Sequence, residues 1–202
     1  MVIKVVLFDC GGVVLRPQDN GTYQRWETHL GYQPGELAKR LWESDAYRRA
    51  EVGQLSEDGF WAEIVPTLPL NAPVEIERLR FELWDVFTPN EDVLTWAERL
   101  RARYKVAILS NATDALDDML RSRFHIADRF DAIYSSARLG VAKPDAAIFN
   151  QVLRSLKIAP AESLFIDDRA ENIAAAAHLG MHVLWYIGVQ ELDRQLQVYL
   201  PN

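Results

Sequence analysis

The stretch VVLFDCGGV, residues 5–13, joins a short hydrophobic run to an acidic residue and two glycines. Because the run is short, β-branched and bounded by glycines, it predicts a buried strand over residues 3–9. Asp9 then stands at the carboxyl end of this strand, where open α/β sheets place their ligands. A second hydrophobic run, LFI at 164–166, ends in the acidic pair Asp167-Asp168. The two runs therefore predict two strands that bring carboxylates to one edge of a sheet.

Strand-like and helical patterns alternate along most of the chain. Further strands are predicted over residues 105–110, 132–135, 163–167 and 182–187. Helical patterns lie between them, over residues 90–104, 113–123, 145–157 and 170–179. Such alternation is typical of a parallel sheet with right-handed helical crossovers. We therefore expect an α/β fold, with a Rossmann-like parallel sheet core flanked by helices.

Residues 17–88 break this alternation. Hydrophobic residues recur there at helical spacing, prolines and glycines separate the segments, and no convincing strand is present. An all-helical block between the first and second strands predicts an inserted cap, placed over the sheet edge that carries Asp9. The expected organisation is a core of residues 1–16 and 89–202 with a helical cap of residues 17–88.

Composition excludes several classes of protein. The 202-residue chain has a net charge of −7 and no dominant Lys or Arg run, so neither nucleic acid nor an anionic membrane surface is an expected partner. No hydrophobic run approaches the roughly 18 residues that span a bilayer. The single cysteine, Cys10, allows no internal disulfide, and the early first strand leaves no room for a signal peptide. We expect a cytoplasmic protein, as either a monomer or a homodimer.

The acidic residues predict a magnesium site. Adjacent carboxylates at a buried strand end repel each other, so Asp167 and Asp168 require a compensating cation. Mg²⁺ takes oxygen ligands and binds one or two carboxylates, several waters and a substrate phosphate. Asp168 could instead cap the helix that follows, but capping would explain only one of the two carboxylates. Together with Asp9, the pair favours Mg²⁺-assisted phosphoryl chemistry with a carboxylate nucleophile.

Three further features favour a phosphate site. The glycines Gly11-Gly12 follow the first strand, and glycines let a backbone approach an anion closely. The pair Ser110-Asn111 ends the second strand, where a hydroxyl and a backbone N–H could bind phosphate oxygens. Lys143 lies in a proline-restricted loop, where its charge would neutralise carboxylates and phosphate. Each feature has an ordinary alternative, namely a tight turn, capping of the next helix and a solvated lysine.

Four segments together resemble the haloacid dehalogenase-like hydrolase superfamily, in its phosphatase branch with a helical cap after the first strand. The segments are FDCGGVV at 8–14, LSNAT at 109–113, GVAKPD at 140–145 and FIDDRAEN at 165–172. They follow the family's order along nearly the whole chain. A further segment, EVGQLS at 51–56, is similar to cap sequence of bacterial sugar-phosphate phosphatases such as α-glucose-1-phosphate phosphatase.

The resemblance implies a Mg²⁺-dependent phosphatase, a hydrolase acting on phosphate monoesters of a small phosphorylated metabolite, with a sugar phosphate favoured. Asp9 would attack phosphorus and form an aspartyl-phosphate. The implied metal ligands are Asp9, Gly11 through its carbonyl, Asp168, and Asp167 directly or through water. The implied phosphate contacts are Gly12, Ser110, Asn111 and Lys143. Asp9, Lys143 and Ser110 would be the catalytic residues, acting through position and charge.

Gly11 departs from the family pattern, because the family usually has there a second aspartate, which protonates the leaving group. Such a general acid/base contributes roughly 10²–10⁴-fold. Glu51 of the cap could replace it, or the leaving group could need no help, as in an anomeric sugar phosphate. The chain could also be a catalytically lapsed phosphate-binding protein. A 2-haloacid dehalogenase is a further alternative, but it predicts an aromatic residue at position 11 and has no use for the acidic pair.

Substrate selection is expected to lie in the cap. The candidates are its charged residues Arg16, Arg40, Arg48, Arg49 and Glu51. The four histidines share no metal-ligand spacing, so none of them is assigned to a site.

Overall fold

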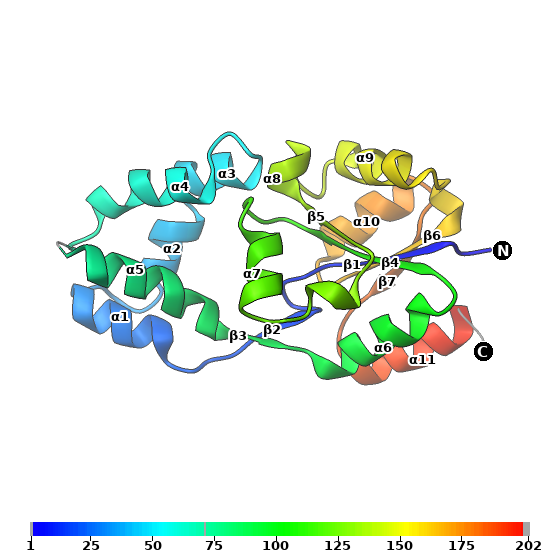
Figure 1. Ribbon diagram of the computed structural model, residues 1–202, viewed down its shortest axis with the longest axis horizontal. Helices are drawn as coiled ribbons and strands as arrows, with labels where there is room; N and C mark the ends of the chain where they lie inside the picture. Colours follow the sequence, from blue (N-terminus) through cyan, green and yellow to red (C-terminus); the bar gives the residue numbers. More distant parts are fainter. Residues whose placement is uncertain (1, 71, 200–202) are drawn as a thin grey trace.

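Five parallel strands form the central sheet (Figure 1). The computed structural model describes residues 2–70 and 72–199. The strand order is β5-β4-β1-β6-β7, so β1 lies at the centre. The strands are β1 Val5–Phe8, β4 Lys105–Ser110, β5 Ala132–Ser135, β6 Ser163–Asp167 and β7 His182–Trp185. All five lie where the sequence predicts strands, although β1 and β7 are shorter than predicted.

β1 is buried on both faces, which explains its unbroken hydrophobic sequence. Val5 and Leu7 pack in one cluster with α9 and α10, whereas Val6 and Phe8 pack in another with α6, α7 and α11. The helices are α6 Glu91–Arg101, α7 Leu116–Ser122, α9 Ala146–Leu156, α10 Ala170–His178 and α11 Val189–Tyr199. Figure 1 shows α9 and α10 on one side of the sheet, and α6 and α11 on the other. The α/β class, with a parallel sheet flanked by helices, is therefore confirmed.

Some elements differ from the prediction. α7 begins at Leu116 rather than at residue 113. The short helix α8 (Ser136–Leu139) and the C-terminal α11 were not predicted. α11 buries Leu192 and Leu196 one turn apart, a pattern too sparse to indicate a helix by itself. The 3-10 turns of the described residues, η1 Val65–Thr67, η2 Leu83–Val86, η3 Ala127–Arg129 and η4 Pro160–Glu162, were also not predicted.

A helical insert separates β1 from β4. Its helices are α1 Thr22–Leu30, α2 Glu36–Trp42, α3 Asp45–Glu51, α4 Glu57–Ile64 and α5 Pro73–Glu82. They bury a hydrophobic cluster of their own, which includes Leu37, Leu41 and Phe60. The insert joins the core through an antiparallel pair, β2 (Leu15–Pro17) with β3 (Phe87–Pro89), which the sequence did not predict. Figure 1 shows these helices at one end of the molecule and the sheet at the other.

The tip of the insert rests on the core beside β4. The Thr113 hydroxyl donates a 2.6 Å hydrogen bond to Glu57 Oε2, and the backbone N–H of Glu57 donates to Asp114 Oδ1 at 2.8 Å. Thr113 and Asp114 therefore hold the N-terminus of α4. Ser56 caps α4, since its hydroxyl accepts the backbone N–H of Gly59 at 3.0 Å. Side chains of the core therefore fix where the insert lies.

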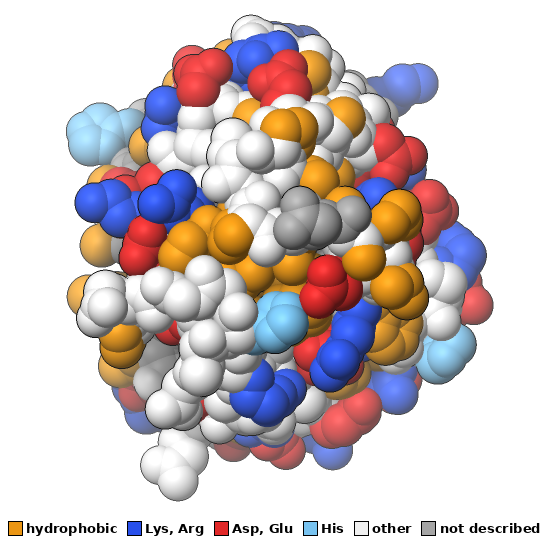
Figure 2. All heavy atoms as spheres, turned by 90° about the vertical axis from the view of Figure 1, so that its left-hand side faces the viewer, with side chains coloured by type: hydrophobic (Ala, Val, Ile, Leu, Met, Phe, Trp, Pro, Cys, Tyr) orange, Lys and Arg blue, Asp and Glu red, His pale blue; other side chains and the backbone are white. Residues whose placement is uncertain are grey.

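The outer face of the insert mixes both signs of charge (Figure 2). Hydrophobic side chains reach the surface near the middle of this face, between Lys/Arg and Asp/Glu side chains. Hydrophobic atoms make up a large part of the surface of most folded proteins, so this exposure is ordinary. Within residues 2–70 and 72–199, no helix has the length and hydrophobicity needed to cross a membrane.

The packing of Gly53 gives a test of the contact between insert and core. Gly53 has a φ of +71°, and a Cβ there would overlap the carbonyl oxygen of Ala137. Gly31 has a φ of +72°, but nothing lies within 4 Å of where its Cβ would be. Gly31→Ala should lower the free energy of unfolding by about 1 kcal/mol, because alanine is strained in this conformation. Gly53→Ala should lower it further. Urea denaturation measures both, and equal losses would contradict the contact.

Candidate active site

The parallel sheet brings three strand ends to one edge. β1 pairs with β4 on one side and with β6 on the other, and all three run in the same direction. Asp9 directly follows β1, Ser110 ends β4 and Asp167 ends β6. Residues that lie far apart in the sequence therefore meet at the carboxyl edge, as the sequence predicts.

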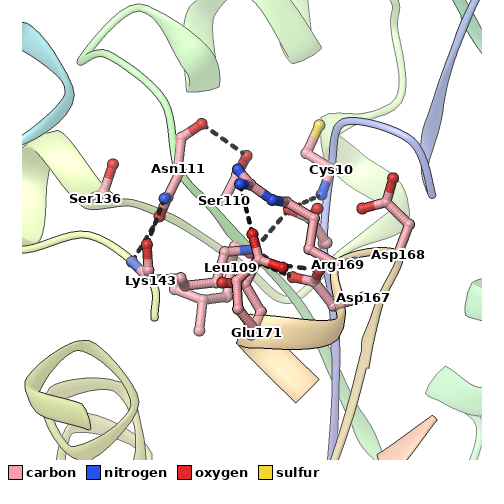
Figure 3. A network of polar contacts seen from close by, with 12 residues as sticks. Cys10, Leu109, Ser110, Asn111, Ser136, Lys143, Asp167, Asp168, Arg169 and Glu171 are labelled. Atoms are coloured by element: carbon pink, nitrogen blue, oxygen red, sulfur yellow. Dashed lines mark hydrogen bonds and ion pairs between the residues drawn. The ribbon is translucent and has the colours of Figure 1, made fainter. Parts of the chain in front are cut away.

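Lys143 lies at the centre of this edge (Figure 3). Its ammonium group is 2.7 Å from Asp9 Oδ1 and 2.7 Å from Asp167 Oδ2. It also donates a hydrogen bond to the carbonyl oxygen of Leu109 at 2.9 Å, and only 1 % of its side chain is exposed. A buried ammonium ion needs partners for its three protons, and here each proton has one. Lys143 therefore joins the ends of β1, β4 and β6 in one network.

Asn111 positions the loop that carries Lys143. Its amide nitrogen donates to the backbone carbonyl of Lys143, and its amide oxygen accepts the backbone N–H of Lys143, both at 2.8 Å. Farther along the loop, Asp145 caps α9 by accepting the N–H of Ala147 at 2.8 Å. The sequence suggested a phosphate contact for Asn111 through its backbone, and gave no sign that its side chain clamps this loop.

Burial is the largest single influence on the pKa values of the charged groups in this network. Burial raises the pKa of Asp9 to about 6. The positive charge of Lys143 lowers this pKa in part, and the negative charge of Asp167 raises it further. Burial acts to lower the pKa of Lys143, but the charges of Asp9 and Asp167 outweigh it and raise that pKa. Burial, followed by the charge of Asp167, also raises the pKa of Asp168. One ammonium group therefore compensates these carboxylates incompletely, and a further cation would favour their charged forms.

The carboxylates are close enough to share a metal ion. Asp9, Asp167 and Asp168 each have an oxygen within 4.8 Å of the others. Both oxygens of Asp167 are already occupied, because they accept hydrogen bonds from Lys143, Arg169 and Asn172. Within the described part of the chain, Asp9 Oδ2 and the Asp168 carboxylate accept no hydrogen bond from another residue. This donor set fits Mg²⁺, which binds one or two carboxylates directly and retains waters.

The two glycines after Asp9 differ in what surrounds them. Gly12 has a φ of +83°, and a Cβ there would overlap the carboxylate of Asp168. Gly11 has no atom within 4 Å of the position where its Cβ would be. Asp168 does not cap the next helix, because α10 has no side-chain cap. Gly12 therefore lets Asp168 approach the turn closely, whereas position 11 has room for a side chain.

The hydroxyl of Ser110 is available to a ligand. Its hydrogen bond in the described structure is a 3.5 Å contact with the carbonyl oxygen of Asn111, at the limit of such an interaction. The edge thus brings together all the site residues named from the sequence. They are Asp9, Gly11, Gly12, Ser110, Asn111, Lys143, Asp167 and Asp168.

A cavity of about 270 Å³ opens beside this edge, between the core and the insert. Its core side is lined by Cys10, Gly11, Ser110 and Asn111, which flank Asp9 and Lys143. Aromatic side chains line much of the rest: Tyr23, Trp42, Tyr47, Trp61, Trp84 and Phe87. The sequence did not indicate that these rings line a cavity, because aromatic residues at helical spacing are also typical of a helix core.

The arginines named as candidates for substrate selection do not line the cavity. Arg40 pairs with Glu36 and Arg49 pairs with Glu63, both on the insert itself. Arg48 donates to a backbone carbonyl in its own segment, and Arg16 is exposed on β2. The cavity is instead lined by Arg80, which the sequence gave no reason to select.

Glu51 lies half-buried at the end of α3. Burial raises its pKa, while the charges of Arg169 and Lys143 act in the opposite direction. Lys143 lies at the sheet edge and Arg169 directly follows Asp168, so Glu51 is within electrostatic range of the site.

Gly12 gives a direct test of the proposed metal ligands. Gly12→Ala should force Asp168 to move and should weaken Mg²⁺ binding at least tenfold, because the ion would lose one carboxylate. Gly180 is the matched control, since its φ is also +83° and nothing lies within 4 Å of where its Cβ would be. Isothermal titration calorimetry with Mg²⁺ should show unchanged affinity for Gly180→Ala. Equal affinities in both variants would remove Asp168 from the site.

Two relatives of this chain are named as phosphatases. D-ribitol-5-phosphate phosphatase from Bacteroides thetaiotaomicron is 26 % identical over 210 aligned residues, which cover 100 % of each chain. A sesquiterpene phosphatase from Aspergillus oryzae is 25 % identical, over 88 % of this chain and 87 % of the relative. Acyl-CoA dehydrogenase family member 10 from Mus musculus is 24 % identical over 90 % of this chain, which spans only 18 % of that longer protein.

Solved structures and a family model agree with the fold. A haloacid dehalogenase family enzyme from Bacteroides thetaiotaomicron, in complex with magnesium and inorganic phosphate, has a TM-score of 0.78 at 22 % identity, covering 91 % of this chain and 93 % of that one. Haloacid dehalogenases are also similar in sequence and fold. The family model of haloacid dehalogenase-like hydrolases matches residues 3–180. Because this match covers most of the chain, the protein belongs to the haloacid dehalogenase-like hydrolases.

Proposed function

We propose that this hydrolase is a Mg²⁺-dependent phosphatase, which cleaves a phosphate monoester of a small metabolite through an aspartyl-phosphate on Asp9. The supporting observation is the group of charges at the carboxyl edge, where Asp9 and Asp168 keep oxygens free beside a buried lysine. Residues 17–88 would act as a cap that closes the site from above. Phosphatases among the relatives, and the similar structure with magnesium and phosphate, support this chemistry.

Asp9 is the proposed nucleophile. Its carboxylate is oriented by the N–H of Cys10 and by the ammonium of Lys143, both 2.7 Å from Oδ1. In the first step, an Asp9 oxygen bonds to phosphorus, the ester P–O bond breaks, and the alcohol leaves with a proton. In the second step, water attacks the phosphorus of the aspartyl-phosphate and loses a proton. Inorganic phosphate then leaves and the Asp9 carboxylate is restored.

The other residues would bind and orient the phosphoryl group. Ser110 would donate its free hydroxyl, and the backbone N–H of Asn111 would face a phosphoryl oxygen. The N–H of Gly12, which the sequence led us to expect at the phosphate, instead donates to the carbonyl oxygen of Leu15 at 2.8 Å. Lys143 would add positive charge. Asp9, Asp168 and the Gly11 carbonyl would hold Mg²⁺, with Asp167 acting through water. The ion would offset the negative charge that builds up on the transferred group.

The proton for the leaving group has no donor at position 11. It would come from water or from Glu51, whose raised pKa favours a protonated carboxyl. A general acid matters most when the leaving group is a poor one, such as an alkyl alcohol. The relatives named for D-ribitol 5-phosphate and for sesquiterpenes differ in the character of the alcohol, so they support the phosphoryl chemistry without specifying the leaving group.

A 2-haloacid dehalogenase is the second candidate, because such enzymes are among the similar proteins. They use the same aspartate without a metal ion, and so have no use for the carboxylate pair found here. Halide release from 2-chloropropionate in the presence of EDTA, without phosphatase activity, would favour this candidate.

Asp9→Asn tests the nucleophile. The amide keeps the size of the side chain but cannot attack phosphorus, so phosphate release from p-nitrophenyl phosphate should fall to the level of the buffer blank. EDTA should abolish the activity of the parent protein, and added Mg²⁺ should restore it. Asp145→Asn is the control, because asparagine caps a helix as well as aspartate does, and it should keep the parent rate. A parent protein that binds Mg²⁺ but releases no phosphate from any ester would be a lapsed enzyme.

Gly11→Asp tests the missing general acid. Because position 11 has open space, an aspartate fits there, and it should raise kcat for ethyl phosphate by about tenfold or more. The effect on p-nitrophenyl phosphate should be smaller, since p-nitrophenolate leaves without a proton. Gly11→Asn has the same size and no acid, and should show no such gain. Equal rates for the two variants would mean that another group, such as Glu51, already supplies the proton.

A further inference from the structure

We infer that the leaving group of the substrate is an apolar alcohol, aromatic or aliphatic, rather than a polyol such as a sugar. The inference rests on the proposed phosphatase function and concerns the cavity beside Asp9. The phosphate would lie at Ser110 and Asn111, and the group attached to it would extend into that cavity.

The walls of the cavity are largely aromatic. Tyr23 comes from α1, Trp42 from α2, Tyr47 from α3 and Trp61 from α4, so four helices of the insert contribute a ring. Trp84 lies on η2, where the insert returns to the core. Trp42 and Tyr47 also pack against each other, with ring centres 5.0 Å apart, so the cavity wall is continuous with the hydrophobic core of the insert. Aromatic side chains present much apolar area to a ligand and lose little conformational entropy when it binds.

Polar groups at the cavity are already paired with one another. Glu57 accepts hydrogen bonds from Thr113 at 2.6 Å and from the Trp61 indole at 2.8 Å. The Trp42 indole donates to the Tyr23 hydroxyl at 2.7 Å. A sugar would have to give up its hydrogen bonds to water on entering, and these groups could replace few of them.

Arg80 and Asn111, which also line the cavity, are paired as well. Arg80 forms an ion pair with Asp58 at 2.6 Å, and its guanidinium lies 5.5 Å from the centre of the Trp61 ring. Both amide atoms of Asn111 are used by Lys143. Within the described residues the Tyr47 hydroxyl has no hydrogen-bond partner, which leaves a polar contact for an otherwise apolar group.

The size of the cavity sets an upper limit on the group that it can hold. An apolar protein cavity of about 150 Å³ is large enough for benzene. The cavity here measures about 270 Å³, so it has room for a two-ring aromatic or for a branched or linear chain of comparable size. Each methylene group that leaves water for such a site strengthens binding by about threefold to fourfold.

A series of linear alkyl phosphates, from ethyl to octyl, tests this inference. Their leaving groups are equally basic, so differences in kcat/KM report binding of the chain rather than chemistry. We expect kcat/KM to rise about threefold to fourfold per methylene until the cavity is full, and to exceed that for glucose 6-phosphate, which is also a primary alkyl phosphate. A flat series, or faster hydrolysis of glucose 6-phosphate, would overturn the inference while phosphate release from p-nitrophenyl phosphate upheld the proposed function.

Binding of analogues that cannot be hydrolysed tests the inference about the leaving group independently of the proposed phosphatase function. Octylphosphonate and ethylphosphonate carry a phosphorus–carbon bond that is not hydrolysed, and tryptophan fluorescence in the presence of Mg²⁺ reports their binding. Tighter binding of octylphosphonate supports the inference even if no ester is cleaved, in which case only the proposed function fails. Equal affinities would overturn the inference.

Variants of the cavity lining, with one control outside it, test whether the alkyl chain binds in the cavity. Trp84→Ala removes a lining ring and should reduce the octyl to ethyl ratio of kcat/KM at least tenfold. Phe81→Ala is the control, because Phe81 is 63 % exposed, lies outside the lining of the cavity and should leave that ratio unchanged. Tyr23→Ser gives a second reading from another helix if Trp84→Ala fails to fold. An unchanged ratio in a folded lining variant would place the alkyl chain elsewhere.

Discussion

The ammonium group of Lys143, buried between Asp9 and Asp167, is the interaction on which the rest of the site depends. Removing one member of a buried ion pair costs about 3–5 kcal/mol, because the remaining charge loses its partner in a medium of low polarity. Lys143 thus has a structural role beside its proposed chemical one, since it joins the ends of three strands. It leaves the carboxylates short of positive charge, and this shortage makes the sheet edge attractive to a divalent cation.

The fold supplies both halves of the proposed reaction. The parallel sheet places the charged groups at one edge, where Asn111 clamps the loop of Lys143 and Gly12 admits Asp168. The insert adds a wall of aromatic rings and is held to the core by Glu57. We therefore propose that the core carries out the phosphoryl chemistry and that the insert selects the leaving group. The same core could serve different esters when the lining of the insert changes.

The sequence predicted the sheet and the charged edge well, because both depend on local patterns. A hydrophobic run that ends in Asp9 or Asp167 indicates a buried strand and its carboxyl end without knowledge of distant residues. The clamp by Asn111, the contact of Thr113 with Glu57 and the aromatic cavity depend on residues far apart in the chain. Tryptophans have the same helical spacing in the sequence whether their rings fill a helix core or line a cavity. The strands β2 and β3 have 3 residues each, which is too few to show a strand pattern in the sequence.

The most direct test of the central claim is the fate of the phosphoryl group on Asp9. Rapid quenching of a reaction with p-nitrophenyl phosphate and Mg²⁺, followed by peptide mass spectrometry, would detect any acid-stable fraction of the intermediate. Our account predicts one added phosphoryl group on the peptide that contains Asp9, formed within the first turnover and lost on further incubation. Phosphate release at the normal rate with no label on Asp9 at any time, or with the label on another residue, would contradict it.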